Sequence, residues 1–73
     1  MNWIPVKSSN ISAVRYLEAS KTLEVNFTSG TIYEYANVPA GVYDEMMAAE
    51  SLGGAFNRLI RRHPEAYPYR QVG

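Results

Sequence analysis

Four arginines and two tyrosines in residues 51–73 have the types and spacing best suited to chemistry with an anion. They are Arg58, Arg61, Arg62, Arg70, Tyr67 and Tyr69. A guanidinium group matches the geometry of a phosphate or carboxylate and stacks on aromatic rings, and tyrosine rings stack on unpaired bases. The pattern predicts a nucleic-acid surface, with RNA as the expected ligand. Arg58 and Arg62 would contact the backbone, Arg61 and Arg70 would make more specific contacts, and Tyr67 or Tyr69 would stack.

The charges of the chain are divided unevenly, although seven basic and seven acidic residues give a net charge of zero. Residues 51–73 hold four arginines against Glu65 alone, a net charge of +3, so residues 1–50 carry −3. A strongly basic nucleic-acid arm is thereby excluded, but a local basic patch is not. The alternative is a solvated helix face whose arginines pair with the acidic part of the same domain.

Catalytic, metal and cofactor chemistry is not expected from this sequence. The absence of cysteine excludes a thiol nucleophile, a disulfide and a thiolate metal site. His63 has no neighbouring ligand, and Glu45 and Glu50 are spaced so that they face different directions. Gly53 and Gly54 lack the phosphate-loop motif, although backbone N–H groups at a helix start there could hold an anion. The chain is therefore expected to be non-enzymatic.

The pattern of apolar residues predicts one α+β domain over residues 1–73. Between residues 11 and 37, apolar and polar residues alternate, as at Leu23, Val25 and Phe27, which indicates strands. We expect a three-stranded antiparallel sheet with meander order, followed by two helices and an extended C-terminal tail that folds back on the domain. The first ten residues are interpreted as a lead-in.

The turn at residues 28–31 decides which face of the sheet the two tyrosines of the next strand occupy. A two-residue loop at Ser29-Gly30 would put Tyr33 and Tyr35 opposite the Leu23, Val25 and Phe27 face. A three-residue loop with Gly30 at positive φ would place Tyr33 beside Val25 and Tyr35 beside Leu23. Burial of a single apolar face favours the longer loop, which makes both tyrosines mainly core residues.

Two helices are predicted after the sheet. Pro39 suits the first turn of one helix, in which Val42 and Met46 recur at helical spacing. Ser51 is a candidate N-cap for the second helix, and Pro64 ends it. The buried stripe of the second helix is expected to be Phe56, Leu59 and Ile60, with Arg58 and Arg62 pointing away from it and Asn57 and Arg61 at its boundary.

The order of short motifs resembles the KTSC domain family. The motifs are SSNI at 8–11, Tyr16, LEVNFTSGTIYEY at 23–35, VPAGVY at 38–43, residues 49–53, Phe56-Asn57, Ile60-Arg61 and YPY at 67–69. Arg15 and Ala55 depart from it, where a glycine and an aromatic residue are expected. The resemblance implies a small module like the C-terminal extension of some lysyl-tRNA synthetases, also free-standing in bacteria and phages, with no established reaction and a link to RNA.

Two functions remain open at this point. The first is an accessory module that binds RNA or another nucleic acid through the arginine-rich second helix and the aromatic tail. The second is a protein-interaction module or small homo-oligomer, for which Trp3, Ile4, Met47 and the tail would supply an apolar patch. No apolar run approaches the roughly 18–20 residues of a membrane helix, so no membrane partner is expected and the cytoplasm is the expected location.

Overall fold

Five antiparallel strands form one sheet in the computed structural model, which describes residues 2–73. They pair in chain order and are β1 (Ile4–Pro5), β2 (Ile11–Leu17), β3 (Thr22–Phe27), β4 (Ile32–Tyr35) and β5 (Tyr69–Gln71). A short 3-10 helix, η1 (Glu18–Ser20), connects β2 to β3. The α+β class and the antiparallel meander are confirmed, but the predicted number of three strands is wrong.

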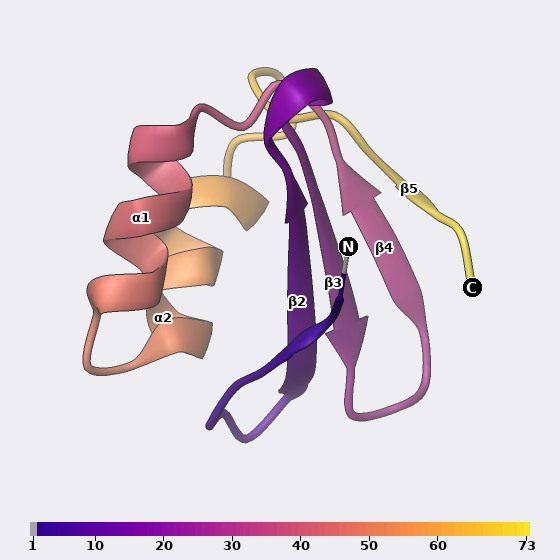
Figure 1. The fold of residues 1–73 in the computed structure, drawn as a ribbon, viewed down its shortest axis with the longest axis vertical. Coiled ribbons are helices and arrows are strands. Elements are labelled where there is room, and N and C mark those ends of the chain that lie inside the picture. The colour runs from indigo at the N-terminus through magenta and orange to yellow at the C-terminus, as the bar shows by residue number, and fades with distance from the viewer. Residues whose placement is uncertain (1) are drawn as a thin grey trace.

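The two additional strands come from the segments interpreted as a lead-in and a tail. In β1, Ile4 pairs with Val14, and in β5, Tyr69 pairs with Tyr35. Both strands are short and lie at the edges of the sheet, so each has only one neighbour. The tail therefore does fold back on the domain, as expected, by adding a strand beside β4 (Figure 1).

The register of the β3–β4 hairpin is the one favoured by the three-residue loop. The Phe27 N–H donates to the Thr31 carbonyl at 2.9 Å, and Gly30 adopts a φ of 96°. Val25 consequently lies opposite Tyr33, and Leu23 lies opposite Tyr35. Tyr35 is buried, but Tyr33 is only partly buried, so the prediction that both tyrosines belong mainly to the core holds fully for Tyr35 alone.

Two helical segments cover one face of the sheet (Figure 1). The first is α1 (Ala40–Ala48), for which Pro39 is the N-cap rather than a residue of the first turn. The second is α2 (Leu52–Phe56), which continues directly into a π-helical turn, η2 (Asn57–Arg61). The Ser51 side chain accepts a hydrogen bond from the Gly54 N–H at 3.2 Å, which confirms the predicted N-cap.

The core lies between the helices and the sheet. Its side chains are more than 90% buried and are Ile11, Val14, Leu23, Val25, Tyr35, Val38, Met46, Leu52, Ala55, Phe56 and Ile60. The Tyr35 and Phe56 rings meet edge to face with their centroids 5.2 Å apart, joining β4 to α2. This contact fixes the distance between the sheet and the arginine-bearing turn η2. Within residues 2–73, no helix has the length and hydropathy needed to cross a membrane.

Candidate nucleic-acid interface

Three of the predicted site residues, Arg58, Arg61 and Arg62, are exposed at the C-terminal end of the second helical segment. The ion pairs among residues 2–73 join Arg15 to Glu24 and Arg70 to Glu34, and the His63 Nδ1 lies 3.5 Å from the Glu65 carboxylate. None of them includes an arginine of η2 or Arg62. Pairing with the acidic part of the domain, the alternative considered for all four arginines, thus applies to Arg70 only.

The structure separates Arg70 from the other arginines. Arg70 lies opposite Glu34 in the β4–β5 register, and its Nε donates to Glu34 Oε1 at 2.8 Å. Successive side chains of a strand point to opposite faces, and the neighbouring Tyr35 packs on Phe56 of α2. Arg70 therefore lies on the face of the sheet that the helices leave open, away from Arg61 and Tyr69.

The two tail tyrosines have different surroundings. Tyr69 is 55% exposed, and its ring lies beside Tyr33 and Tyr35 with centroid distances of 5.8 Å and 5.7 Å. Tyr67 is partly buried and packs against the core. Of these two, Tyr69 has the accessible ring that stacking on a ligand requires.

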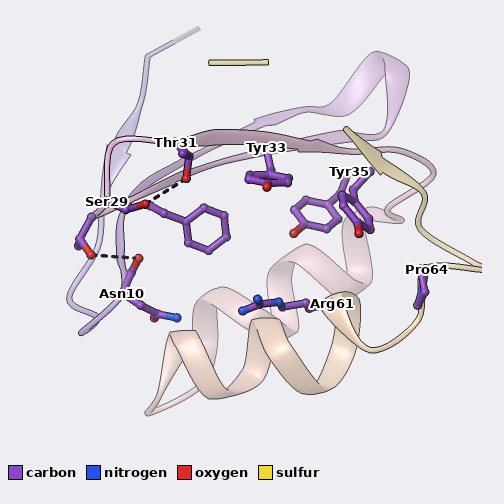
Figure 2. Close-up of a pocket in the computed structure, with 10 residues that line it drawn as sticks. Asn10, Ser29, Thr31, Tyr33, Tyr35, Arg61 and Pro64 are labelled. Atoms are coloured by element: carbon purple, nitrogen blue, oxygen red, sulfur yellow. Dashed lines mark hydrogen bonds between the residues drawn. The ribbon is translucent and has the colours of Figure 1, made fainter. Parts of the chain in front are cut away.

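A cleft of about 470 Å³ opens between the β3–β4 hairpin, the tail and η2. Its aromatic and apolar wall consists of Phe27, Tyr33, Tyr35, Pro64 and Tyr69, and its polar wall of Asn10, Thr28, Ser29 and Thr31. Figure 2 shows Arg61 on the helix side, extending across the cleft below Tyr33 toward Asn10. The structure thus brings together Arg61 and Tyr69, which the sequence singled out.

Among residues 2–73, no carboxylate lines this cleft, so Arg61 makes it electropositive. Burial raises the pKa of the Tyr35 hydroxyl, and the Arg61 guanidinium acts in the opposite direction, which places that charge close to the ring. The hydroxyls of Tyr33, Tyr35 and Tyr69 make no hydrogen bond to another group of residues 2–73. They are therefore available to a ligand.

Asn10 is held at the cleft by two neighbours. Its carbonyl accepts from the Thr28 N–H at 3.0 Å, and its Oδ1 accepts from the Ser8 hydroxyl at 2.9 Å. The amide nitrogen is left as a donor, and in Figure 2 it points toward Arg61. A second hollow, of about 580 Å³ and including Lys7 and Glu50, shares Asn10 and Arg61 with the cleft.

Sequence reasoning missed part of this site. Asn10 and Phe27 were not singled out, and Tyr33 and Tyr35 were interpreted as core residues. The Tyr33-Glu34-Tyr35 triplet could have indicated the aromatic wall, because side chains two residues apart on a strand share a face. What the sequence did not show was that the tail pairs with this strand and adds Tyr69 to the same face. Residues 2–73 contain no group of three His, Cys, Asp or Glu side chains that could hold a metal ion.

The apolar patch expected for protein interaction is not continuous. Trp3 is partly buried and lies beneath the Arg15 guanidinium, 4.7 Å from the ring centroid, while Met47 packs against the core. Ile4 and Val72 remain exposed at 43% and 45%. Ile4 belongs to β1 and Val72 follows β5, so they lie at opposite edges of the sheet.

Comparison with known proteins identifies similar chains among small bacterial proteins and within larger enzymes. The profile of the KTSC domain matches residues 7–63. A protein of Tsukamurella paurometabola is 42% identical over 57 residues, covering 78% of this chain and 85% of its own length. An uncharacterized protein of Stutzerimonas stutzeri is 33% identical over 72 residues, covering 99% of both chains.

A lysine–tRNA ligase of Nostoc sp. is 42% identical over 55 residues, which cover 75% of this chain but 10% of the ligase. Among solved structures, a KTSC domain protein from Yersinia pestis superposes with a TM-score of 0.88 at 29% identity. That match covers 99% of this chain and 97% of the other. The similarity to the ligases is thus confined to a small part of those enzymes.

Proposed function

The chain belongs to the KTSC domain family, and we propose that it is a non-enzymatic accessory module that binds RNA. The contact surface is formed by Arg58, Arg61 and Arg62 together with the exposed tail ring of Tyr69. The three arginines supply phosphate contacts, and the tyrosine supplies a stacking surface.

The observation that carries this proposal is the set of three exposed arginines that have no acidic partner among residues 2–73. The ion pairs at Arg15 and Arg70 use Glu24 and Glu34, and Glu65 lies beside His63. The positive charge of residues 58–62 is therefore not neutralised locally. Such a local excess attracts a polyanion even though the whole chain has no net charge.

The similarity to lysine–tRNA ligases supports RNA as the ligand. The names of those proteins include tRNA, so a module of this kind within them would lie close to an RNA. A protein-interaction role has less support in the geometry, since Ile4 and Val72 lie at opposite edges of the sheet instead of forming one patch.

The test is the affinity for a labelled oligouridine strand, measured by fluorescence anisotropy between low and moderate salt. The slope of log affinity against log salt reports about 0.7 units for each phosphate contact of a single strand. Replacing Arg58 and Arg62 together by alanine should weaken binding and flatten the slope by about 1.4 units. The melting temperature should barely change, because exposed arginines without partners contribute little to folding.

Lys21→Asn provides the matched control. Lys21 is exposed at the β2–β3 turn with a φ of 54°, a conformation that asparagine accommodates. This variant removes one positive charge outside the proposed surface and should leave the slope unchanged. The proposal is rejected if the parent protein does not bind the strand, or if the double variant keeps the parental slope.

A further inference from the structure

The cleft beside Arg61 is lined by aromatic rings that phosphate contacts alone would not need. Phe27 and Tyr33 meet edge to face at 5.7 Å, and Tyr69 adds an exposed ring beside Tyr33 and Tyr35. Duplex RNA offers no unstacked base to such a wall, whereas single-stranded RNA does. The volume of the cleft, about 470 Å³, falls in the range of about 300–1,000 Å³ found for small-molecule sites.

Donors converge at one side of the cleft from two different elements. Arg61 reaches in from η2, and the Asn10 amide nitrogen faces it from the segment before β2 (Figure 2). Asn10 is oriented by the Ser8 hydroxyl, which donates to its Oδ1 at 2.9 Å. An anion between these two groups would receive charge-assisted hydrogen bonds, and no carboxylate of the described residues lines the cleft to compete with it.

Aromatic rings beside a paired cation and amide donor match a ligand that is aromatic at one end and anionic at the other. We propose that the cleft is a nucleotide subsite, in which one unpaired base of the RNA lies among Tyr33, Tyr35 and Tyr69 and its phosphate lies between Asn10 and Arg61. This inference rests on the proposed RNA binding and assigns to it a preference for single strands. The neighbouring hollow shares Asn10 and Arg61 with the cleft, so the next nucleotide of the RNA strand could leave the subsite through it.

The test compares a short oligouridine strand with an RNA duplex of equal length by fluorescence anisotropy. The parent protein should bind the single strand more tightly. Tyr69→Ala removes the exposed ring and should weaken single-strand binding by about fivefold or more, the loss expected for one base–aromatic stack. The same change should leave the affinity for the duplex unaltered.

A second variant closes the cleft without changing charge or the tyrosine rings. Ser29 lies in the exposed hairpin loop and lines the cleft, so Ser29→Trp should obstruct it and weaken single-strand binding to a similar extent. Ala19→Trp is the matched control, because it adds the same side chain to η1, at the other end of β3. Ala19→Trp should leave binding unchanged.

The position of the phosphate is tested with uridine 5′-monophosphate in an NMR titration. The Asn10 side-chain amide and the ring signals of Tyr33 and Tyr69 should shift together, and Asn10→Asp, which brings a carboxylate against the phosphate, should abolish the shifts. Shifts confined to other residues would overturn the subsite.

Failure of the subsite is distinguishable from failure of RNA binding. If single strand and duplex bind equally, and Tyr69→Ala and Ser29→Trp have no effect while the Arg58 and Arg62 double variant weakens binding, the proposed function stands and the subsite is rejected. If the parent protein binds neither RNA, both are rejected.

Discussion

Arg70 and Glu34 lie opposite each other on β5 and β4, and the Arg70 Nε donates to Glu34 Oε1 at 2.8 Å. The pair ends a row of directly opposed residues that crosses four strands of the open sheet face as Arg15, Glu24, Glu34 and Arg70. The two glutamates are neighbours, and each is paired with an arginine on its outer side. Arg70 therefore offsets repulsion between two adjacent carboxylates.

This relationship predicts that Arg70→Gln leaves RNA binding unchanged. The Arg70 side chain pairs with Glu34 on the face of the sheet opposite the cleft. Neither the affinity for oligouridine nor the salt slope of that affinity should therefore change. Stability should fall by less than about 1 kcal/mol, because the arginine is 75% exposed. Denaturation by urea and the anisotropy titration check the two parts. A flatter salt slope for this variant would mean that the open face also contacts RNA.

The register of the sheet was predictable from the sequence because one residue decided it. Gly30 favours the three-residue loop through its positive φ, and the alternation at Leu23, Val25 and Phe27 then determines which side chains share a face. The edge strands were not predictable in the same way. Ile4–Pro5 and Tyr69–Gln71 are too short to show alternation, and their pairing depends on partners already folded.

The candidate site was predictable in its charges but not in its walls. Arg58, Arg61 and Tyr69 stand out by residue type, and the structure leaves all three exposed. Asn10 is held at the cleft by hydrogen bonds to Ser8 and Thr28, and no local sequence pattern predicts these bonds. Arg70 was grouped with the other arginines because the sequence does not show that the tail forms a strand. In that strand, successive side chains point to opposite faces, so Arg70 points away from the face that Tyr69 occupies.

The partial burial of Tyr33 predicts a moderate cost for its removal. Tyr33→Ala should lower the free energy of unfolding by about 1–3 kcal/mol, less than the roughly 3–5 kcal/mol lost when a fully buried aromatic residue is truncated. Tyr33→Phe should be nearly neutral, because the hydroxyl has no hydrogen-bond partner in residues 2–73. Chemical denaturation measures both. An alanine variant as stable as the parent would show that the ring lies outside the cooperative core.

An alanine at Gly53 is predicted to displace the ends of the Ser8 and Asn10 side chains, because both approach this glycine closely. A Cβ there would lie 2.9 Å from both Ser8 Oγ and Asn10 Oδ1. Gly53→Ala should therefore disrupt the Ser8–Asn10 hydrogen bond, displace the Asn10 amide and weaken RNA binding. The free energy of unfolding should change by less than about 1 kcal/mol, because both side-chain ends can move aside and alanine favours a helix over glycine by up to about that amount.

Gly41→Ala is the matched control for that substitution. Gly41 lies in α1, and apart from its chain neighbours and the nearby backbone of α1 no atom of residues 2–73 lies within 4 Å of its ideal Cβ position. Alanine there should therefore be neutral or stabilising and leave RNA binding intact. Thermal unfolding and oligouridine affinity of the two variants decide the matter. Equal behaviour of both would mean that the contact of Gly53 with Ser8 and Asn10 is not needed.

The closeness of Arg61 to Tyr35 predicts an alkaline dependence of stability. Burial, the largest influence, raises the pKa of the Tyr35 hydroxyl above 10.0, so the folded protein retains a proton that the unfolded chain releases as the pH rises past that value. Stability should therefore be unaffected below the unfolded pKa and fall above it. Tyr35→Phe should remove part of this loss while leaving stability at neutral pH nearly unchanged.

Arg61→Gln then tests the geometry on which the cleft depends. The guanidinium charge favours the tyrosinate and acts against the effect of burial, so its removal should raise the pKa of Tyr35 further. The alkaline loss of stability should then still begin at the pKa of the unfolded chain but become larger. Tyrosine ring signals followed by NMR as the pH is raised measure the shift, and Arg58→Gln, one turn earlier on the exposed side, should leave it unchanged. If both variants leave the Tyr35 titration where it is, Arg61 does not lie across the cleft from this ring, and the anion position between Arg61 and Asn10 loses its support.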